Sequence, residues 1–182
     1  HFNGDQEAPW ATSMGDEQYQ WLKATLENST AKWKFVFTHH INGTGRGAAA
    51  IVGREEWGGG SGNQFATYRP TWEKPIHQLF VDSGVTIFFQ GHDHAYSREI
   101  VDGVVYQEVP NPADNSYYPY NCEAYAPDQI NPLPGLGGER NVYGVYDKAT
   151  AVVLPNTGFL KVTVAGDESV RGDYIRSYRD ED

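Results

Sequence analysis

The chain has 182 residues, enough for one domain, or most of one, with a substantial core. Its 39% hydrophobic and 14% aromatic content excludes an intrinsically disordered protein. A formal net charge of −10 argues against nucleic-acid and membrane partners, and no apolar run approaches the length that a membrane span needs. Cys122 is the single cysteine, so no internal disulfide is expected.

A helix and a strand are the first elements predicted after an irregular, polar start. Apolar residues at helical spacing predict a helix from Asp16 to Glu27, and its acidic first turn suits a helix amino terminus. The apolar run Lys34–Thr38 then predicts a buried strand that ends at His39-His40.

Residues 41–70 are rich in glycine and lead away from this histidine pair. Glycine permits close approach of the backbone, so the segment is compatible with a phosphate-cradling loop and equally with a flexible surface loop. Arg46 lies between two glycines, which suits contact with an anion.

A second helix and a second buried strand follow. The start signal Arg69-Pro70-Thr71 leads into a helix predicted over residues 73–83. Pro75 lies in its first turn, and Gly84 is its carboxyl-terminal cap. His77 on this helix is predicted to be structural or exposed. The run Val85–Phe89 predicts the buried strand, which ends at Gln90-Gly91-His92-Asp93-His94.

The remaining chain favours antiparallel strands. Asp102-Gly103 between two alternating runs, residues 97–101 and 104–109, predicts a hairpin. Residues 110–157 are rich in Pro, Asn and Tyr and show no clear period. Residues 159–165 and 169–178 alternate again around a turn. The triplet Arg171-Gly172-Asp173, typical of integrin ligands, falls inside the last strand and is interpreted as chance.

Histidines therefore follow two predicted strands, and this is the chemically informative pattern. Parallel strands joined by a crossover helix bring their carboxyl ends to one edge of a sheet, where ligands bind in open α/β folds. Neutral imidazoles there suit zinc, iron, copper or nickel. Loop histidines with ordinary hydrogen bonds are the alternative. We expect one histidine of the pair His39-His40 to converge with His92 and His94, and Asp93 to point away from its neighbours.

The two segments Phe35–His40 and Phe88–His94 resemble the last two motifs of the calcineurin-like metallophosphoesterases. The resemblance extends roughly from Gly15 to Tyr178, and the glycine-rich insert is similar to one in secreted bacterial phosphoesterases. The family's earlier motifs are Asp-x-His, Gly-Asp-x-x-Asp and Gly-Asn-His-Asp/Glu. None of these motifs is present in the position or context that the family needs. Gly15-Asp16 has the letters Gly-Asp, but it opens a predicted helix and does not follow a buried strand. The chain therefore looks like the C-terminal half of such a domain, with the N-terminal half expected as an upstream segment or a separate chain.

The resemblance implies an α/β fold that forms part of a layered α/β/β/α sandwich. It implies a metal-dependent phosphoesterase that hydrolyses phosphomonoesters or phosphodiesters with a metal-bridged hydroxide. The complete enzyme would hold two divalent ions (zinc, iron, manganese or calcium), with His39 and His92 at one and His94 at the other. Asn42 and Arg46 would contact the phosphate, no catalytic residue is assigned, and the location would be secreted or periplasmic.

Two other functions remain open from the residues alone. One is a non-catalytic structural or interaction module on the same scaffold, with the aromatic-rich segment 110–157 as its surface. The other is a mononuclear site of three histidines with different chemistry. Because imidazoles are neutral, the chain by itself is expected to hold at most one metal ion, weakly, and to be inactive toward phosphate esters.

Overall fold

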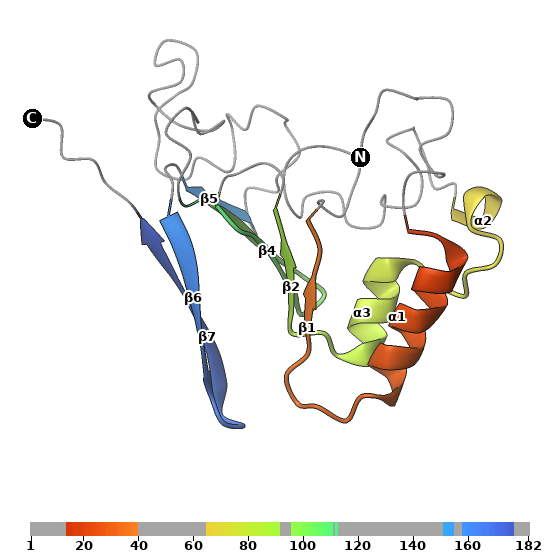
Figure 1. Ribbon diagram of the computed structural model, residues 1–182, viewed down its shortest axis with the longest axis horizontal. Coiled ribbons are helices and arrows are strands. Elements are labelled where there is room, and N and C mark those ends of the chain that lie inside the picture. Colours follow the sequence, from red (N-terminus) through yellow and green to blue (C-terminus); the bar gives the residue numbers. More distant parts are fainter. Residues whose placement is uncertain are drawn as a thin grey trace, which may run out of the picture.

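The computed structural model describes residues 14–39, 65–91, 96–110, 112, 151–154 and 158–176. These residues form helices together with parallel and antiparallel strands, so the predicted mixed α/β class is confirmed at that level (Figure 1). No helix within these residues is long and apolar enough to cross a membrane.

Helix α1 (Asp16–Asn28) forms where it was predicted, with Gly15 as its N-cap. No side chain caps this amino end. The carboxylate of Asp16 instead accepts hydrogen bonds of 2.9 Å from both Thr71 Oγ1 and the Trp72 indole nitrogen. The ring of Tyr19 stacks on Trp72 at a centroid distance of 4.2 Å. The first turn of α1 is therefore bound to the segment that precedes the next long helix.

A five-stranded sheet in the order β1-β2-β4-β3-β5 forms the centre of the described structure. β1 (Phe35–Phe37) pairs in parallel with β2 (Ile87–Gln90), as expected for two strands joined by a helical crossover. The hairpin of β3 (Tyr96–Val101) and β4 (Val104–Glu108) is also confirmed. Its turn has φ of 48° at Asp102 and 84° at Gly103, the left-handed geometry that tight hairpins require.

Several expectations about this sheet were wrong in detail. β4 is antiparallel to β3 but parallel to β2, so not every later strand is antiparallel. β1 is not buried, because it is the edge strand and Phe37 is 72% exposed. β5 (Ala151–Leu154) lies in the stretch for which no strand was predicted, and it pairs with β3.

The helices also differ from expectation at their starts. α3 (Ile76–Ser83) begins after Pro75, later than the predicted residue 73, because the preceding residues are engaged with α1. Gly84 ends it with φ of 66°, as predicted. A short helix, α2 (Phe65–Tyr68), lies in the glycine-rich stretch where none was expected.

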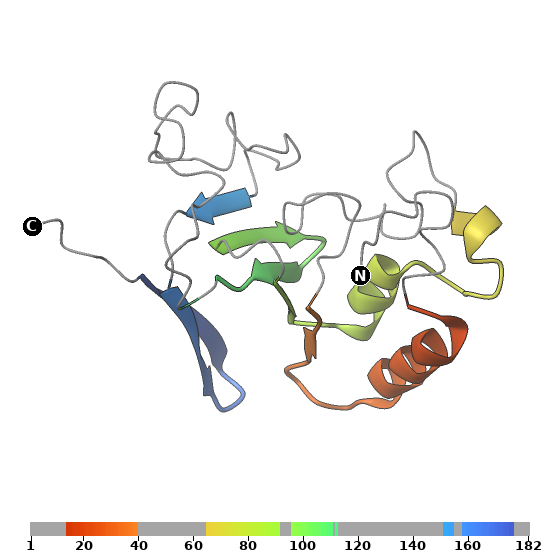
Figure 2. The ribbon, with the colours of Figure 1, turned by 45° about the horizontal axis from the view of Figure 1, so that its top comes forward.

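Helices α1 and α3 pack on one side of the sheet, and an antiparallel hairpin lies on the other (Figures 1 and 2). The hairpin consists of β6 (Gly158–Ala165) and β7 (Ser169–Arg176), as predicted. Tyr174 of β7 stacks on Tyr96 of β3 at 4.3 Å. Arg171 and Asp173 are bonded to each other at 2.7 Å within the regular strand.

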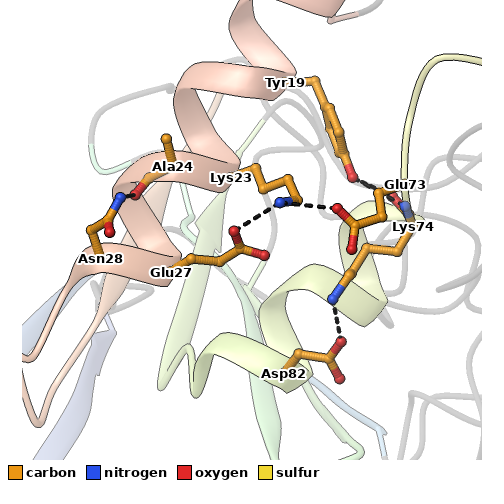
Figure 3. A network of polar contacts seen from close by, with 8 residues as sticks. All are labelled: Tyr19, Lys23, Ala24, Glu27, Asn28, Glu73, Lys74 and Asp82. Atoms are coloured by element: carbon orange, nitrogen blue, oxygen red, sulfur yellow. Dashed lines mark hydrogen bonds and ion pairs between the residues drawn. The ribbon is translucent and has the colours of Figure 1, made fainter.

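The core lies between the sheet and helices α1 and α3. A network of polar contacts joins α1 to α3 and to the segment before α3 (Figure 3). Tyr19 donates a 2.8 Å hydrogen bond to the carbonyl of Lys74, and Lys23 lies 3.0 Å from Glu73. Hydrogen bonding from Lys23 lowers the pKa of the Glu73 carboxyl, and bonding from Lys74 lowers the pKa of Asp82. Because these ion pairs are exposed, they orient the helices more than they stabilise the fold.

Candidate functional site

The carboxyl ends of β1 and β2 lie side by side, and their pairing continues beyond both strands. Thr38 N donates a hydrogen bond of 3.0 Å to Phe89 O, and Gly91 N donates one of 3.0 Å to His39 O. His39 and Gly91 are therefore direct neighbours at one edge of the sheet. The crossover through α3 produces this arrangement, because it makes the two strands parallel and adjacent.

The imidazole of His39 lies against Gly91. A Cβ atom placed on Gly91 would stand 3.9 Å from His39 Nδ1 and 3.5 Å from its carbonyl oxygen. His39 is exposed, so its ring is at the surface of this edge, next to the residue that precedes His92. The structure thus brings one predicted ligand to the start of the segment that carries the other two.

Of the predicted site residues, His39 is the one that falls within the described part of the chain. The other predicted metal ligands, His92 and His94, lie outside the described residues, as do the predicted phosphate contacts, Asn42 and Arg46. Asp93 and His40 also lie outside them. The described structure therefore places the edge and one histidine, and the convergence of the three histidines stays a prediction.

Aromatic rings line the side of the sheet that faces away from the helices. Phe37 and Phe89 are register partners, and their rings stack at a centroid distance of 4.9 Å. Phe88, one residue earlier on β2, points to the opposite side and meets Phe80 of α3 at 5.1 Å. Phe37 and Phe89 thus form an apolar surface two residues before His39 and Gly91.

A row of buried polar side chains crosses the carboxyl end of the sheet. Gln90 on β2 pairs in register with Glu108 on β4, which pairs with Ser97 on β3. All three residues are at most 1% exposed. Ser97 Oγ donates to Glu108 Oε2 at 3.4 Å, and Gln107 Nε2 donates to the carbonyls of Ser97 and Glu108.

Sequence reasoning missed this buried row. Its signal was present, because Gln107-Glu108 is a polar pair inside an otherwise apolar strand, but the pair was not expected to be enclosed. The hairpin with β3 was predicted, but the parallel pairing of β4 with β2 on its other side could not be read from the sequence. Without that second partner, an alternating strand that ends in Glu predicts a solvated carboxylate.

Tyr96 begins β3, directly after the segment that carries His92 and His94. Burial raises the pKa of its phenol above the usual value, and Arg98 acts in the opposite direction. The phenol therefore stays protonated at neutral pH and serves as an aromatic contact for Tyr174.

No group of three or more His, Cys, Asp or Glu side chains that could hold a metal ion occurs among residues 14–39, 65–91, 96–110, 151–154 and 158–176. Comparison with known proteins supplies no relative, since no protein-family model matches the chain and no curated protein matches it. The function is therefore argued from the motifs and from the geometry of the sheet edge.

Proposed function

We propose that this chain is the C-terminal half of a calcineurin-like metallophosphoesterase domain, which hydrolyses phosphomonoesters or phosphodiesters. The observation that carries the proposal is the contact of His39 with Gly91 at the carboxyl edge of two parallel strands. Two parallel strands that each lead to a histidine in the sequence, and that pair as far as His39 and Gly91, are what a shared metal site at this edge requires.

The proposed fold of the complete domain is a layered α/β/β/α sandwich. Helices α1 and α3 would form one outer layer, and the five-stranded sheet the layer beneath it. The hairpin β6–β7, held to the sheet through Tyr96 and Tyr174, would belong to the second sheet. The N-terminal half would supply the remaining strands and the other outer helices, as an upstream segment or a separate chain.

His39 and His92 would hold one divalent metal ion and His94 the other. The donor chemistry fits, since the His39 imidazole is exposed and its carbonyl is fixed by Gly91, which limits the backbone freedom of this residue. When bound, the metal ions supply Lewis acidity and an activated water. Zinc, iron, manganese and calcium all remain compatible with this proposal.

Asn42 and Arg46 would bind the phosphate group of the substrate. The chain carries a net charge of −10, so a phosphate needs local positive charge, and a guanidinium offers a fork of donors that matches its oxygens. In the complete enzyme, Arg46→Ala should raise KM while kcat changes less, because the contact is made in ground state and transition state alike.

A secreted or periplasmic location belongs to the same proposal and rests on the similarity of the glycine-rich insert to secreted bacterial phosphoesterases. Phosphate-ester substrates are then small molecules or exposed groups, and neither nucleic acid nor a membrane is proposed as a partner. The acidic composition supports this choice, since it disfavours binding to anionic polymers.

A second candidate, a non-catalytic interaction module, is favoured by the exposed aromatic ring of Phe37. Phe37, Ile100 and Val152 are all exposed on the same face of the sheet, and a group of exposed apolar side chains is typical of a surface that meets another protein. In this function the histidines would make ordinary hydrogen bonds, and metal ions would not be required.

Zinc binding by purified residues 1–182 separates the two candidates. The affinity is measured by competition with a chromophoric chelator for the wild type and for His39→Ala, His92→Ala and His94→Ala. Because the chain alone is expected to hold at most one ion, the changes at the histidines that bind that ion should lower the affinity by about tenfold or more. His77→Ala is the matched control, since His77 is bonded to Tyr106 and Asp102 instead. Equal affinity in the wild type and all three site variants would favour the interaction module.

A further inference from the structure

Asn28-Ser29-Thr30, at the carboxyl end of α1, matches the acceptor motif Asn-x-Ser/Thr of N-linked glycosylation. The motif combines an asparagine amide, which receives the sugar, with a hydroxyl two residues later, and any residue except proline can stand between them. Asn42-Gly43-Thr44 also matches the motif, but it lies outside the described residues. All three residues of the first motif are described, so the structure shows their surroundings.

Both functional side chains of this motif lie at the surface. Asn28 and Thr30 are exposed, and Ser29 between them is half-buried. Helix α1 ends at Asn28, and Ser29 has extended backbone with φ of −76° and ψ of 126°. The motif therefore lies where the chain leaves a helix at the surface. A bulky and strongly hydrated glycan needs such a position, because burial would remove its hydration.

The amide of Asn28 can carry a sugar and keep its contact in the fold. Its Nδ2 donates a hydrogen bond of 2.7 Å to the carbonyl of Ala24, one helical turn earlier. An amide nitrogen has two hydrogens, and glycosylation replaces one of them. The N–H that remains can still donate to Ala24, so the last turn of α1 would retain this bond.

The motif lies at the end of the sheet opposite to the candidate metal site. The connection from α1 enters β1 at its amino end, where Lys34 Nζ donates to the carbonyl of Leu26 at 3.2 Å. His39 and Gly91 lie beyond the carboxyl ends of β1 and β2. The α1–β1 connection and these carboxyl ends are at opposite ends of the strands (Figure 1). A glycan on Asn28 would therefore leave the edge that carries His39 open.

We propose that Asn28 is a site of N-linked glycosylation. In this reaction, a bond forms between Asn28 Nδ2 and C1 of an oligosaccharide that is activated on a lipid pyrophosphate. The bond from C1 to the pyrophosphate oxygen breaks, the lipid pyrophosphate leaves, and Nδ2 loses one proton. The proposal rests on the proposed export of the chain, since this modification occurs on exported proteins, and it does not depend on metal binding.

The test is to express residues 1–182 with a secretory signal in a eukaryotic cell that glycosylates its exported proteins. Every protein tested carries Asn42→Gln, so that Asn28 is the one remaining match to the motif in the sequence. The secreted chain should migrate more slowly in gel electrophoresis. Treatment with peptide N-glycosidase should remove this shift and convert Asn28 to aspartate, which mass spectrometry detects.

Thr30→Ala and Thr30→Ser are matched variants in the same background. Both change an exposed side chain, so both should keep the midpoint of urea unfolding. Alanine removes the hydroxyl that the motif requires and should abolish the shift, whereas serine keeps a hydroxyl and should retain the shift. Asn28→Gln removes the acceptor amide itself and should also abolish the shift.

The outcomes separate this inference from the proposed function. A shift in the Asn42→Gln chain and in its Thr30→Ser variant, but not in its Thr30→Ala variant, supports glycosylation of Asn28. An unshifted Asn42→Gln chain, or a shift that persists in Thr30→Ala, overturns it and leaves the proposed metal site unaffected. Failure of a glycosylated chain to bind zinc overturns the proposed function and leaves the glycosylation site in place.

Discussion

At the scale of single residues, the distance between His39 and Gly91 determines how large a side chain fits at position 91 of the sheet edge. The proximity of these two residues was predictable, because each follows a strand of a crossover pair. The direction of the His39 ring was not, since it depends on how the chain leaves β1 after Phe37. The approach of Nδ1 to Gly91 is therefore information that only the structure supplies.

A Gly91→Ala change should be tolerated, whereas Gly91→Val should displace the His39 ring. The added Cβ of alanine meets His39 at 3.5 and 3.9 Å, ordinary contact distances, so stability should change by no more than about 0.5 kcal/mol. Valine adds two further methyl groups toward the same ring and should cost about 1–3 kcal/mol. Urea unfolding and the NMR signals of the His39 imidazole check both variants. An undisturbed His39 signal in the valine variant would contradict this expectation.

His77 fastens helix α3 to the β3–β4 hairpin and should matter for stability. Its Nε2 donates to the Asp102 carboxylate at 3.0 Å, so in the neutral ring Nδ1 accepts the hydroxyl of buried Tyr106 at 2.7 Å. His77→Ala should lower the free energy of unfolding by about 1–3 kcal/mol. Asp102→Asn should cost no more than about 1 kcal/mol, because that side chain is 69% exposed and asparagine tolerates its positive φ. Denaturant unfolding measures the loss of stability in both variants. A larger loss in Asp102→Asn than in His77→Ala would contradict this expectation.

At the scale of elements, the strongly patterned segments were predictable and those defined by distant partners were not. Helix α1 and the β3–β4 hairpin carry their signals locally, in spaced apolar residues and in Asp102-Gly103. β5 has four residues and exists through its pairing with β3, which no local pattern reveals. The late start of α3 has a similar cause, since Lys74 N donates to the Tyr19 hydroxyl of α1, and Pro75 disfavours a helical conformation at the residue before it.

The contact between α1 and the segment before α3 should weaken in alkaline solution. Burial raises the pKa of the Tyr19 phenol above its usual value of 10.0. The folded protein then holds this proton more tightly than the unfolded chain, so stability is complete below about pH 10 and declines as pH rises through the folded pKa.

Tyr19→Phe should remove this part of the decline and, below pH 10, should cost about 1 kcal/mol through the lost hydrogen bond to the Lys74 carbonyl. The measurement is urea unfolding of both proteins between pH 8 and about pH 11, across the range in which tyrosine titrates. Parallel pH profiles for the two proteins would show that Tyr19 does not cause the decline.

At the scale of the whole molecule, the two β layers leave apolar side chains exposed between them. Phe37, Ile100 and Val152 lie on the sheet face that points away from the helices, and each is at least 42% exposed. Val162 and Val164 of the hairpin share a side with Tyr174, which stacks on the sheet. An exposed apolar surface of this kind is consistent with the proposed need for an N-terminal half.

This chain alone should not hydrolyse phosphate esters, even with added metal ions. Its predicted ligands are neutral imidazoles, and two divalent ions about 4 Å apart repel each other by about 16 kcal/mol at an effective dielectric near 20. Enzymes of the resembled family offset this repulsion with a bridging carboxylate from a motif that the chain lacks. Glu108 cannot replace it, because its side chain is enclosed among β2, β3 and β4. Residues 1–182, assayed with zinc or manganese and an activated aryl phosphate, should show background turnover. Turnover that His92→Ala abolishes would mean that one metal ion, or a carboxylate of this chain, is sufficient for the chemistry.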